Sequence, residues 1–285
     1  MKKQIDHILL GREKNISDDE VVLQSLPHKD FRFASPFIVV HHMPERNYPA
    51  GSPPVRLNPH PHRGFAPVTF LFQGENYHKD SAGNSGLLKA GEVQWMFAGS
   101  GLLHSEGPTP EFLAKGGNYE LVQLWVNVPA EYKMTAPWYQ QASNAEMPRI
   151  AEEAGIDLHL VSGTYDELEG PIKPPTPVTA IFGTMEGGEY IDFFANEGDW
   201  TLLYLLDGAL TVNGEEIEKH HLVVFNQAGT DITVTALEDS KLVYLTAQPI
   251  DEPVAAKGNF VMNTNEEIAQ AEQDYAEGKF GTLDY

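Results

Sequence analysis

The chain of 285 residues contains no cysteine. Disulfide bonds and thiolate ligands are therefore excluded, and only histidine, aspartate or glutamate side chains remain to hold a metal ion. Basic residues are also scarce, since 19 Lys and Arg stand against 41 Asp and Glu, and the formal net charge is −22. This charge repels phosphate backbones and anionic membrane surfaces, so we expect no direct binding of nucleic acid and no membrane association.

Long apolar runs are missing as well. No run approaches the roughly 20 apolar residues that a membrane-spanning helix needs. The apolar stretch Ile8–Leu10 near the N-terminus is far too short for a signal peptide. We therefore expect a cytoplasmic protein, whose length suffices for one large all-β unit or for two domains.

Short runs rich in β-branched and aromatic residues recur along the chain, separated by glycine, proline and asparagine. A spacing of about ten residues between such runs is typical of an all-β sandwich or barrel. The clearest runs read PVTFLF, EVQWMF, YELVQLWVNV, TAIFG, WTLLYLLDG, HLVVFN and DITVTAL.

Only two segments have a helical pattern. The weaker one covers residues 144–154. The other covers residues 265–277, where Thr264 or Asn265 can cap the first turn and Gly278 ends the helix.

A weak internal repeat divides the chain. The first copy contains FLFQG at 70–74 and MFAG at 96–99, and the second contains YLLDG at 204–208 and NQAG at 226–229. Two copies of one β-barrel domain are the simplest explanation of this pattern.

Two histidine-containing pairs stand out in the first half. NPHPHRGF contains His60 and His62, and GSGLLHSEGP contains His104 and Glu106. In an extended strand residues i and i+2 share a face, so each pair presents both side chains to the same side. The pairs can converge on one divalent ion such as Fe, Mn, Ni, Cu or Zn, and an octahedral ion would keep two positions open. The alternative is that each pair lies in a polar loop or a solvated strand.

Other conspicuous residues receive structural interpretations. We expect His78 and Arg63 at the surface, Arg63 because it follows His62 directly and faces the other side of the strand. Trp95 and Trp125 lie in strong strand patterns and are expected in the core.

Four motifs together resemble the pirin family of bicupin proteins: HPHRGF, GEVQWMFAGSGLLHSEGP, LVQLWVNV and FVMNTNEEIAQAEQDYAEGKFG. The resemblance implies two cupin β-sandwich domains, with one metal ion, usually iron, in the first. We accordingly expect a metal-binding cupin domain at 1–136, a linker at 137–157 and a second cupin domain at 158–285 that ends in the helical tail 265–277.

The resemblance also implies the ligands. Carried over by motif, they are His60, His62, His104 and Glu106, the same four residues that the spacing selects, and Fe2+ is the expected ion. One departure is that Ala66 and Pro67 stand where the family usually has Glu-Thr. We expect this change to remove an acid beside the ligands and so to alter metal affinity or activity.

The second copy of the repeat has no equivalent ligands. The aligned positions are occupied by Phe194, Asn196, Val234 and Ala236. We therefore expect the second domain to bind no metal of its own.

If the chain is an enzyme, the resemblance implies a dioxygenase of the quercetinase type that acts on a small aromatic enol such as a flavonol. It would open the ring with O2 and release carbon monoxide. Glu106 is then the candidate to accept the hydroxyl proton. The alternative is a metal- or redox-responsive binding protein without turnover that contacts a regulatory protein partner, and a third is a metal-stabilised cupin. We expect a monomer.

Overall fold

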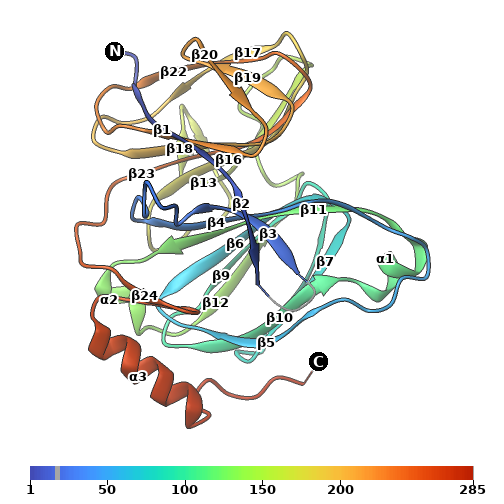
Figure 1. The fold of residues 1–285 in the computed structure, drawn as a ribbon, viewed down its shortest axis with the longest axis vertical. Helices are drawn as coiled ribbons and strands as arrows, with labels where there is room; N and C mark the ends of the chain where they lie inside the picture. Colours follow the sequence, from blue (N-terminus) through green and yellow to red (C-terminus); the bar gives the residue numbers. More distant parts are fainter. Residues whose placement is uncertain (17–19, 285) are drawn as a thin grey trace. The chain divides into compact units, whose positions relative to one another are not determined.

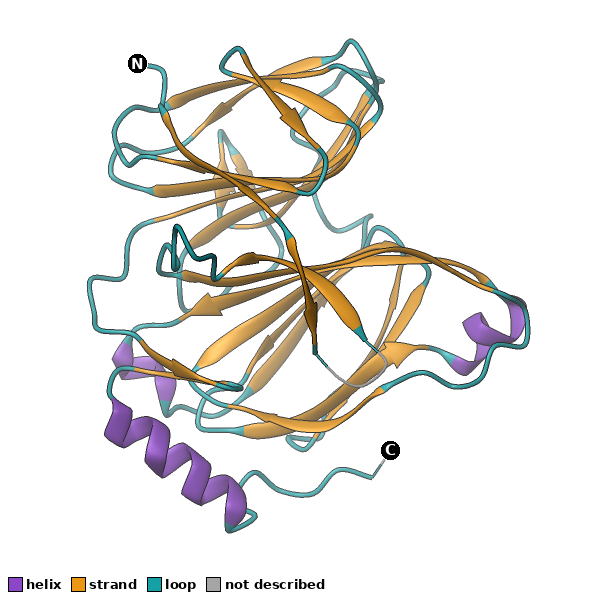
Figure 2. Cartoon of the chain, in the orientation of Figure 1, coloured by secondary structure: helices purple, strands orange, loops and turns teal. Residues whose placement is uncertain are grey.

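Short strands joined by tight turns make up most of the structure, and helices are few (Figure 2). The computed structural model describes residues 1–16 and 20–284. The predicted all-β class with a C-terminal helix is confirmed, but the weak helix expected at 144–154 is wrong, because turns and irregular backbone occupy this range. Across the described residues, every helix is too short or too polar to cross a membrane.

The described chain divides into two compact units, each discontinuous in sequence. Unit 1 contains residues 1–16, 20–42 and 142–249, and unit 2 contains residues 43–141 and the C-terminal segment from Ile250 onward. The division therefore differs from the contiguous ranges expected from the sequence. The end of the chain belongs to unit 2, which contains the first cupin domain. Buried charged residues described below account for this packing.

Two antiparallel sheets that face each other form most of unit 1 (Figure 1). One has the strand order β1-β21-β18-β23-β16-β13, and the other has the order β17-β22-β19-β20. The strands of these sheets are β1 Ile5–Leu10, β13 Ile156–Ser162, β16 Val178–Met185, β17 Tyr190–Phe194, β18 Trp200–Asp207, β19 Ala209–Val212, β20 Glu215–Glu218, β21 His221–Phe225, β22 Asp231–Ala236 and β23 Ser240–Ala247.

Aliphatic and aromatic side chains fill the space between the sheets of unit 1. Leu203, Val223 and Tyr244 belong to this core, and each is completely buried. Val234 and Ala236, two positions that the repeat aligns with ligands, lie in the same apolar cluster. The inward-facing side chains of this barrel therefore pack against one another in an apolar core.

Unit 2 also contains two sheets. One has the order β5-β10-β7-β8, and in the other β12, β9, β6 and β11 follow one another. These elements are β5 Leu57–His62, β6 Phe65–Gln73, β7 Glu75–Asp80, β8 Ser85–Lys89, β9 Val93–Phe97, β10 Leu102–Pro108, β11 Gly117–Asn127 and β12 Trp138–Ala142, with the short helices α1 Pro110–Lys115 and α2 Ala130–Lys133. Trp95 on β9 is fully buried, which confirms its predicted place in the core.

Five further strands remain before the C-terminal segment, and one of them crosses the boundary between the units. The boundary between units falls inside β4 Phe37–Tyr48, which pairs with β3 Val21–Leu26, and β3 pairs in turn with β2 Arg12–Asn15. The two-residue strands β14 Thr164–Tyr165 and β15 Leu168–Glu169 form a hairpin in unit 1.

The C-terminal segment forms the hairpin β24 Ala255–Lys257 and β25 Phe260–Met262, followed by α3 Asn265–Ala276 (Figure 1). Thr264 is the N-cap of α3. Its side chain accepts a hydrogen bond from the backbone N–H of Glu267, and the Glu267 carboxylate accepts the N–H of Thr264 at 3.0 Å. This reciprocal capping explains why the helix begins where its sequence predicts.

One face of α3 packs against other parts of unit 2. Ile268 and Ala271 are buried in a cluster with Phe260 and Phe280. Tyr275, which helical spacing would place on the same stripe, is 43% exposed. Asp274 occupies the buried position instead, so the apolar stripe is interrupted by a carboxylate that needs a partner.

Asp274 has two basic partners: Lys279, which donates to its Oδ1 at 2.8 Å, and the buried Arg63, directly after the HPH motif. Its guanidinium donates to Asp274 Oδ2 at 2.8 Å and to the carbonyl of Ser100 at 2.7 Å, and it lies over the ring of Phe280 at 4.7 Å. Arg63 does face away from His62, yet α3 covers it and leaves it only 4% exposed. The surface position expected for Arg63 is therefore wrong.

A buried lysine makes the second connection. The Lys133 ammonium donates to the Gly64 carbonyl at 2.7 Å, the Asn127 side-chain oxygen at 2.6 Å and the Val261 carbonyl at 3.0 Å. A Cβ atom on Gly64 would lie 2.1 Å from the Val261 oxygen, so only glycine permits this close approach. Lys133 thus joins the loop after β5 to β25, and burial lowers its pKa to about 7.

Replacing Lys133 by methionine should destabilise unit 2. The apolar side chain removes the hydrogen bonds that Lys133 donates to three oxygens, and we expect a loss of about 2–4 kcal/mol in the free energy of unfolding. Urea unfolding at pH 6, where the lysine is charged, measures it. The exposed Lys29→Met variant is the control and should stay within about 0.5 kcal/mol of the wild type. Equal stability of Lys133→Met and wild type would contradict the role of this ammonium.

Candidate metal centre

Three neighbouring strands supply the candidate ligands of the site. β10 lies between β5 and β7. In the register of the sheet, His104 is opposite His60 on β5 and Asp80 on β7, and Glu106 is opposite His78. Because side chains alternate along each strand, residues at i and i+2 project from the same face. The candidate ligands therefore project from one face of a single sheet.

The structure brings His60, His62 and His104 together. Their ring centroids are separated by 4.2 Å between His60 and His104, 4.8 Å between His62 and His104, and 4.9 Å between His60 and His62. One ring nitrogen from each lies within 4.8 Å of those of the other two. This spacing suits three imidazoles around one ion.

The hydrogen bonds of the imidazoles indicate which nitrogens are available. Nδ1 of His60 lies 2.8 Å from the carbonyl of Asn58, and Nδ1 of His62 lies 3.3 Å from the carbonyl of Asn259. A carbonyl only accepts, so these Nδ1 atoms carry hydrogen and each Nε2 keeps its lone pair. Nε2 of His62 and of His104 is buried and has no hydrogen-bond partner among the described residues. Such orphaned nitrogens fit metal ligation.

Burial keeps the two innermost imidazoles neutral. The pKa of His62 and that of His104 lie well below the ordinary histidine value, chiefly because burial penalises the charged form and secondly because His60 is close. A neutral imidazole offers the lone pair that a metal ion needs, so no proton has to leave at neutral pH before an ion binds.

Glu106 is held by two glutamines. Gln94 donates to one carboxylate oxygen at 3.1 Å, and Gln123 donates to the other at 2.6 Å. The indole N–H of Trp125 donates to the Gln123 oxygen at 3.3 Å, and the hydroxyl of Tyr139 donates to the Gln94 oxygen at 3.3 Å. These donors fix the orientation of both amides, so each NH2 group must face Glu106.

Glu106 does not join the three imidazoles as a single close group. One carboxylate oxygen lies within 4.8 Å of ring nitrogens of His104 and His78, which makes a second group that shares His104 with the first. His78 is fully buried, so the surface position expected for it is wrong. The overlooked signal is Asp80 at i+2, because β7 buries its alternate polar residues Asn76, His78 and Asp80.

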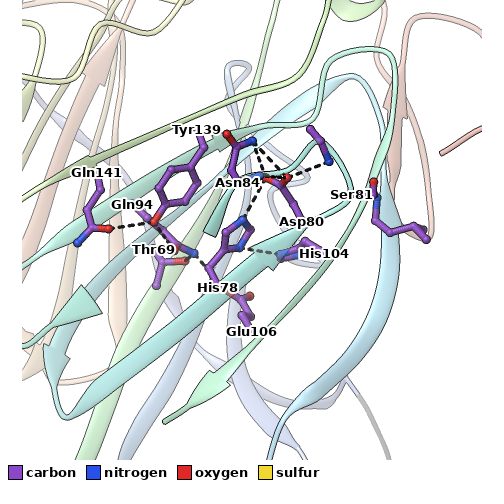
Figure 3. Close-up of polar contacts among 12 residues, drawn as sticks. Thr69, His78, Asp80, Ser81, Asn84, Gln94, His104, Glu106, Tyr139 and Gln141 are labelled. Carbon is purple, nitrogen blue, oxygen red and sulfur yellow. Dashed lines mark hydrogen bonds and ion pairs between the residues drawn. The ribbon is translucent and has the colours of Figure 1, made fainter. Parts of the chain in front are cut away.

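Figure 3 shows His78 between Asp80 and His104. Nε2 of His78 lies 3.3 Å from Asp80 Oδ2, and its Nδ1 lies 3.4 Å from Nδ1 of His104. The ring of Tyr139 stacks on His78 with centroids 4.9 Å apart and planes 13° apart. Burial raises the pKa of Asp80, but hydrogen bonds with His78 and Asn84 outweigh it and hold the pKa below its ordinary value.

Trp125 lines the site and is not a core residue, contrary to expectation. Its side chain is partly exposed, and its ring lies 5.4 Å from that of His62 and 4.4 Å from that of Phe65. Phe65 on β6 also lies 5.1 Å from His62, so Phe65 faces the site and Ala66 faces the opposite side of the strand. The expectation that an acid at position 66 would adjoin the ligands is therefore wrong.

Comparisons with protein families agree with both halves of the chain. A family model described as pirin matches residues 19–126. A second model, described as the pirin C-terminal cupin domain, matches residues 182–281. The first range contains all four residues that the spacing selects.

Individual proteins resemble the chain over nearly its whole length. Pirin-1 of Arabidopsis thaliana is 34% identical over 284 residues, covering 97% of this chain and 94% of that protein. Pirin of Homo sapiens is 30% identical over 286 residues, covering 98% and 94%. The crystal structure of quercetin 2,3-dioxygenase from Acinetobacter baumannii has a TM-score of 0.93 and 36% sequence identity, with 100% of both chains covered.

The buried imidazoles should make the metal-free protein sensitive to acid. His62 and His104 have a lower pKa in the folded chain than in the unfolded chain, so the unfolded chain binds more protons below the ordinary histidine pKa. Stability should therefore be fully present above about pH 7 and should fall as the pH drops below about 6.5, by about 1.4 kcal/mol per pH unit for each imidazole.

Urea unfolding of chelator-treated protein between pH 7.5 and 5 measures this slope. A His62→Gln, His104→Gln double variant should lose the part of the slope that these two imidazoles cause and keep the part due to buried His41, whose pKa is lowered to about 3. His221→Gln, a partly exposed control in unit 1, should retain the full slope. An unchanged slope in the double variant would show that other groups cause the acid sensitivity.

Proposed function

Because this chain belongs to the pirin family, we propose that it is a mononuclear metal protein that cleaves a flavonol such as quercetin with O2. The ligands in this proposal are His60, His62, His104 and Glu106. Fe2+ is the ion that we expect, with Mn, Ni, Cu and Zn as alternatives, because imidazole and carboxylate ligands do not discriminate among these ions.

One observation carries the proposal. Nε2 of His62 and Nε2 of His104 are buried without hydrogen-bond partners among the described residues, while their Nδ1 atoms are engaged. Leaving a buried polar nitrogen unpaired costs about 1–3 kcal/mol. Two such atoms close together beside His60 are readily explained if a cation binds them.

The surrounding residues support the chemistry of a dioxygenase. When bound, the ion supplies a Lewis acid that polarises a substrate oxygen. Glu106 is our candidate to accept the proton of the flavonol hydroxyl, and Gln94 and Gln123 keep its carboxylate in place. The partly exposed ring of Trp125 beside His62 offers a flat face for an aromatic substrate.

A regulatory protein without turnover is the second candidate, and one observation favours it. His62 contacts the carbonyl of Asn259, and the adjacent Arg63 binds Asp274 of α3. The ligand segment is therefore in direct contact with the C-terminal helix. Through these contacts, a change of the metal or of its redox state can alter a surface that a regulatory partner can reach.

We predict one divalent ion per chain. The His62→Ala, Glu106→Ala double variant should lose the ion and keep its fold, because it removes two of the four ligands. Elemental analysis after reconstitution measures the ion, and circular dichroism checks the fold. A His221→Ala, Glu215→Ala variant removes a histidine and a glutamate from unit 1 and should bind metal as the wild type does. Full occupancy of the first double variant would refute the ligand assignment.

Turnover is tested by anaerobic reconstitution with Fe, Mn, Ni, Cu or Zn, followed by addition of quercetin and measurement of oxygen uptake. Glu106→Gln should retain much of the metal but lower the rate by about 10²-fold or more, the usual loss when a general base is removed. The Gln side chain also turns one NH2 group toward Gln94 or Gln123, which already donate there.

Glu111→Gln on α1, an exposed position, is the matched control and should keep the wild-type rate. A Glu106→Gln variant as fast as wild type would leave the dioxygenase but remove Glu106 as its base. No oxygen uptake by the wild type with any of the five metals would favour the regulatory protein.

A further inference from the structure

Asp80, His78 and His104 form a row of hydrogen-bonding groups across β7 and β10 (Figure 3). None of the sequence motifs assigns a role to the first two. His78 is completely buried and Asp80 is 2% exposed, so their polar atoms must find partners within the protein.

The direction of the hydrogen bonds follows from Asp80. Its Oδ1 accepts the backbone N–H groups of Ala82 at 2.9 Å and Asn84 at 3.0 Å, and its Oδ2 accepts the Asn84 side chain at 3.0 Å. A carboxylate surrounded by donors is an acceptor only. At the 3.3 Å contact with Asp80, Nε2 of His78 is therefore the donor.

The rest of the row then has one consistent arrangement. A neutral imidazole that carries its hydrogen on Nε2 has a lone pair on Nδ1, so His78 accepts at the 3.4 Å contact with His104. His104 must donate there from its own Nδ1. Its lone pair is thereby placed on Nε2, which is the buried nitrogen without a partner among the described residues.

The packing around His78 prevents its ring from leaving the row. Tyr139 stacks on one face of the imidazole, with planes 13° apart. Behind Tyr139, a Cβ on Gly86 would lie 2.0 Å from the tyrosine hydroxyl oxygen, so glycine at 86 makes room for this ring. The orientation of His78 is thus set by stacking as well as by hydrogen bonds.

We propose that Asp80 and His78 are positioning residues that hold His104 in the tautomer whose Nε2 can bind the metal ion. This role rests on the proposed metal centre. It assigns His78 to the support of a ligand and not to the ion itself, although His78, His104 and Glu106 are close enough to form a ligand group of their own. Hydrogen bonds of this kind to a ligating histidine typically change metal affinity 10–100-fold.

Asp80→Asn tests the pair with little change in shape. The two backbone N–H groups of Ala82 and Asn84 require an oxygen, so the new NH2 group must face Nε2 of His78. His78 then has to accept there and to carry its hydrogen on Nδ1, where it opposes the N–H of His104. We expect the affinity for Co2+, measured by chelator competition, to fall about 10–100-fold, with one ion still bound at saturation.

A second measurement needs no metal. Nitrogen-15 NMR of the histidine rings in the metal-free protein should show His104 protonated at Nδ1 in the wild type, and a changed protonation pattern in Asp80→Asn. Asp251→Asn, at an exposed position, is the control and should match the wild type in both measurements.

Variants of His78 separate positioning from ligation. His78→Asn offers an acceptor oxygen close to the place of Nδ1 and should keep the Co2+ affinity within a few-fold of that of the wild type. His78→Leu offers no acceptor and should not keep it. If His78 only positions, the Co2+ absorption bands of both variants at saturation should match those of the wild type. A band shift in both would make His78 a ligand and overturn the proposal.

Two further results would count against the proposal. Unchanged Co2+ affinity and an unchanged His104 tautomer in Asp80→Asn would overturn it while leaving the metal centre intact. A wild type that binds no Co2+, Fe2+ or Ni2+ would overturn the metal centre and this role together.

Discussion

Side chains alternate along an extended strand, and the site depends on this rule acting on β5, β10 and β7 at once. Each strand contributes two polar residues separated by one position, and antiparallel pairing places His104 opposite His60 and Asp80. A shift of one residue in any of these registers would turn that strand's pair to the other face. The register of one sheet therefore decides whether the imidazoles meet.

Burial then determines how the polar groups are used. A buried amide, imidazole or carboxylate is costly unless it is hydrogen-bonded, and around Glu106 this requirement is met in two layers. Gln94 and Gln123 hold the carboxylate, and Tyr139 and Trp125 hold the glutamines. Because every member has a defined donor or acceptor role, the carboxylate cannot rotate without breaking several bonds. The network therefore keeps the Glu106 side chain in one orientation.

The C-terminal segment is an integral part of unit 2. Lys133 binds Val261, Arg63 binds Asp274, and Asn259 contacts His62, so polar contacts join residues that are 128 to 211 positions apart in the chain. Removing one partner of a buried ion pair is strongly destabilising. The pair of Arg63 and Asp274 therefore ties the C-terminal segment to the strands that carry the candidate ligands. A change that disrupts the packing of α3 therefore also destabilises the site.

The sequence alone determined what local rules control. Alternation and turn residues predict the all-β class, the capping residues predict α3, and the i, i+2 spacing selects His60, His62, His104 and Glu106. Only the tertiary structure decided the environment of residues whose neighbours are distant in sequence. His78 and Arg63 are polar residues that the sequence places at the surface, yet Tyr139 of β12 stacks on His78 and α3 covers Arg63. The physical reason is that periodicity assigns a face to each side chain, whereas long-range pairing of strands and helices decides what covers that face.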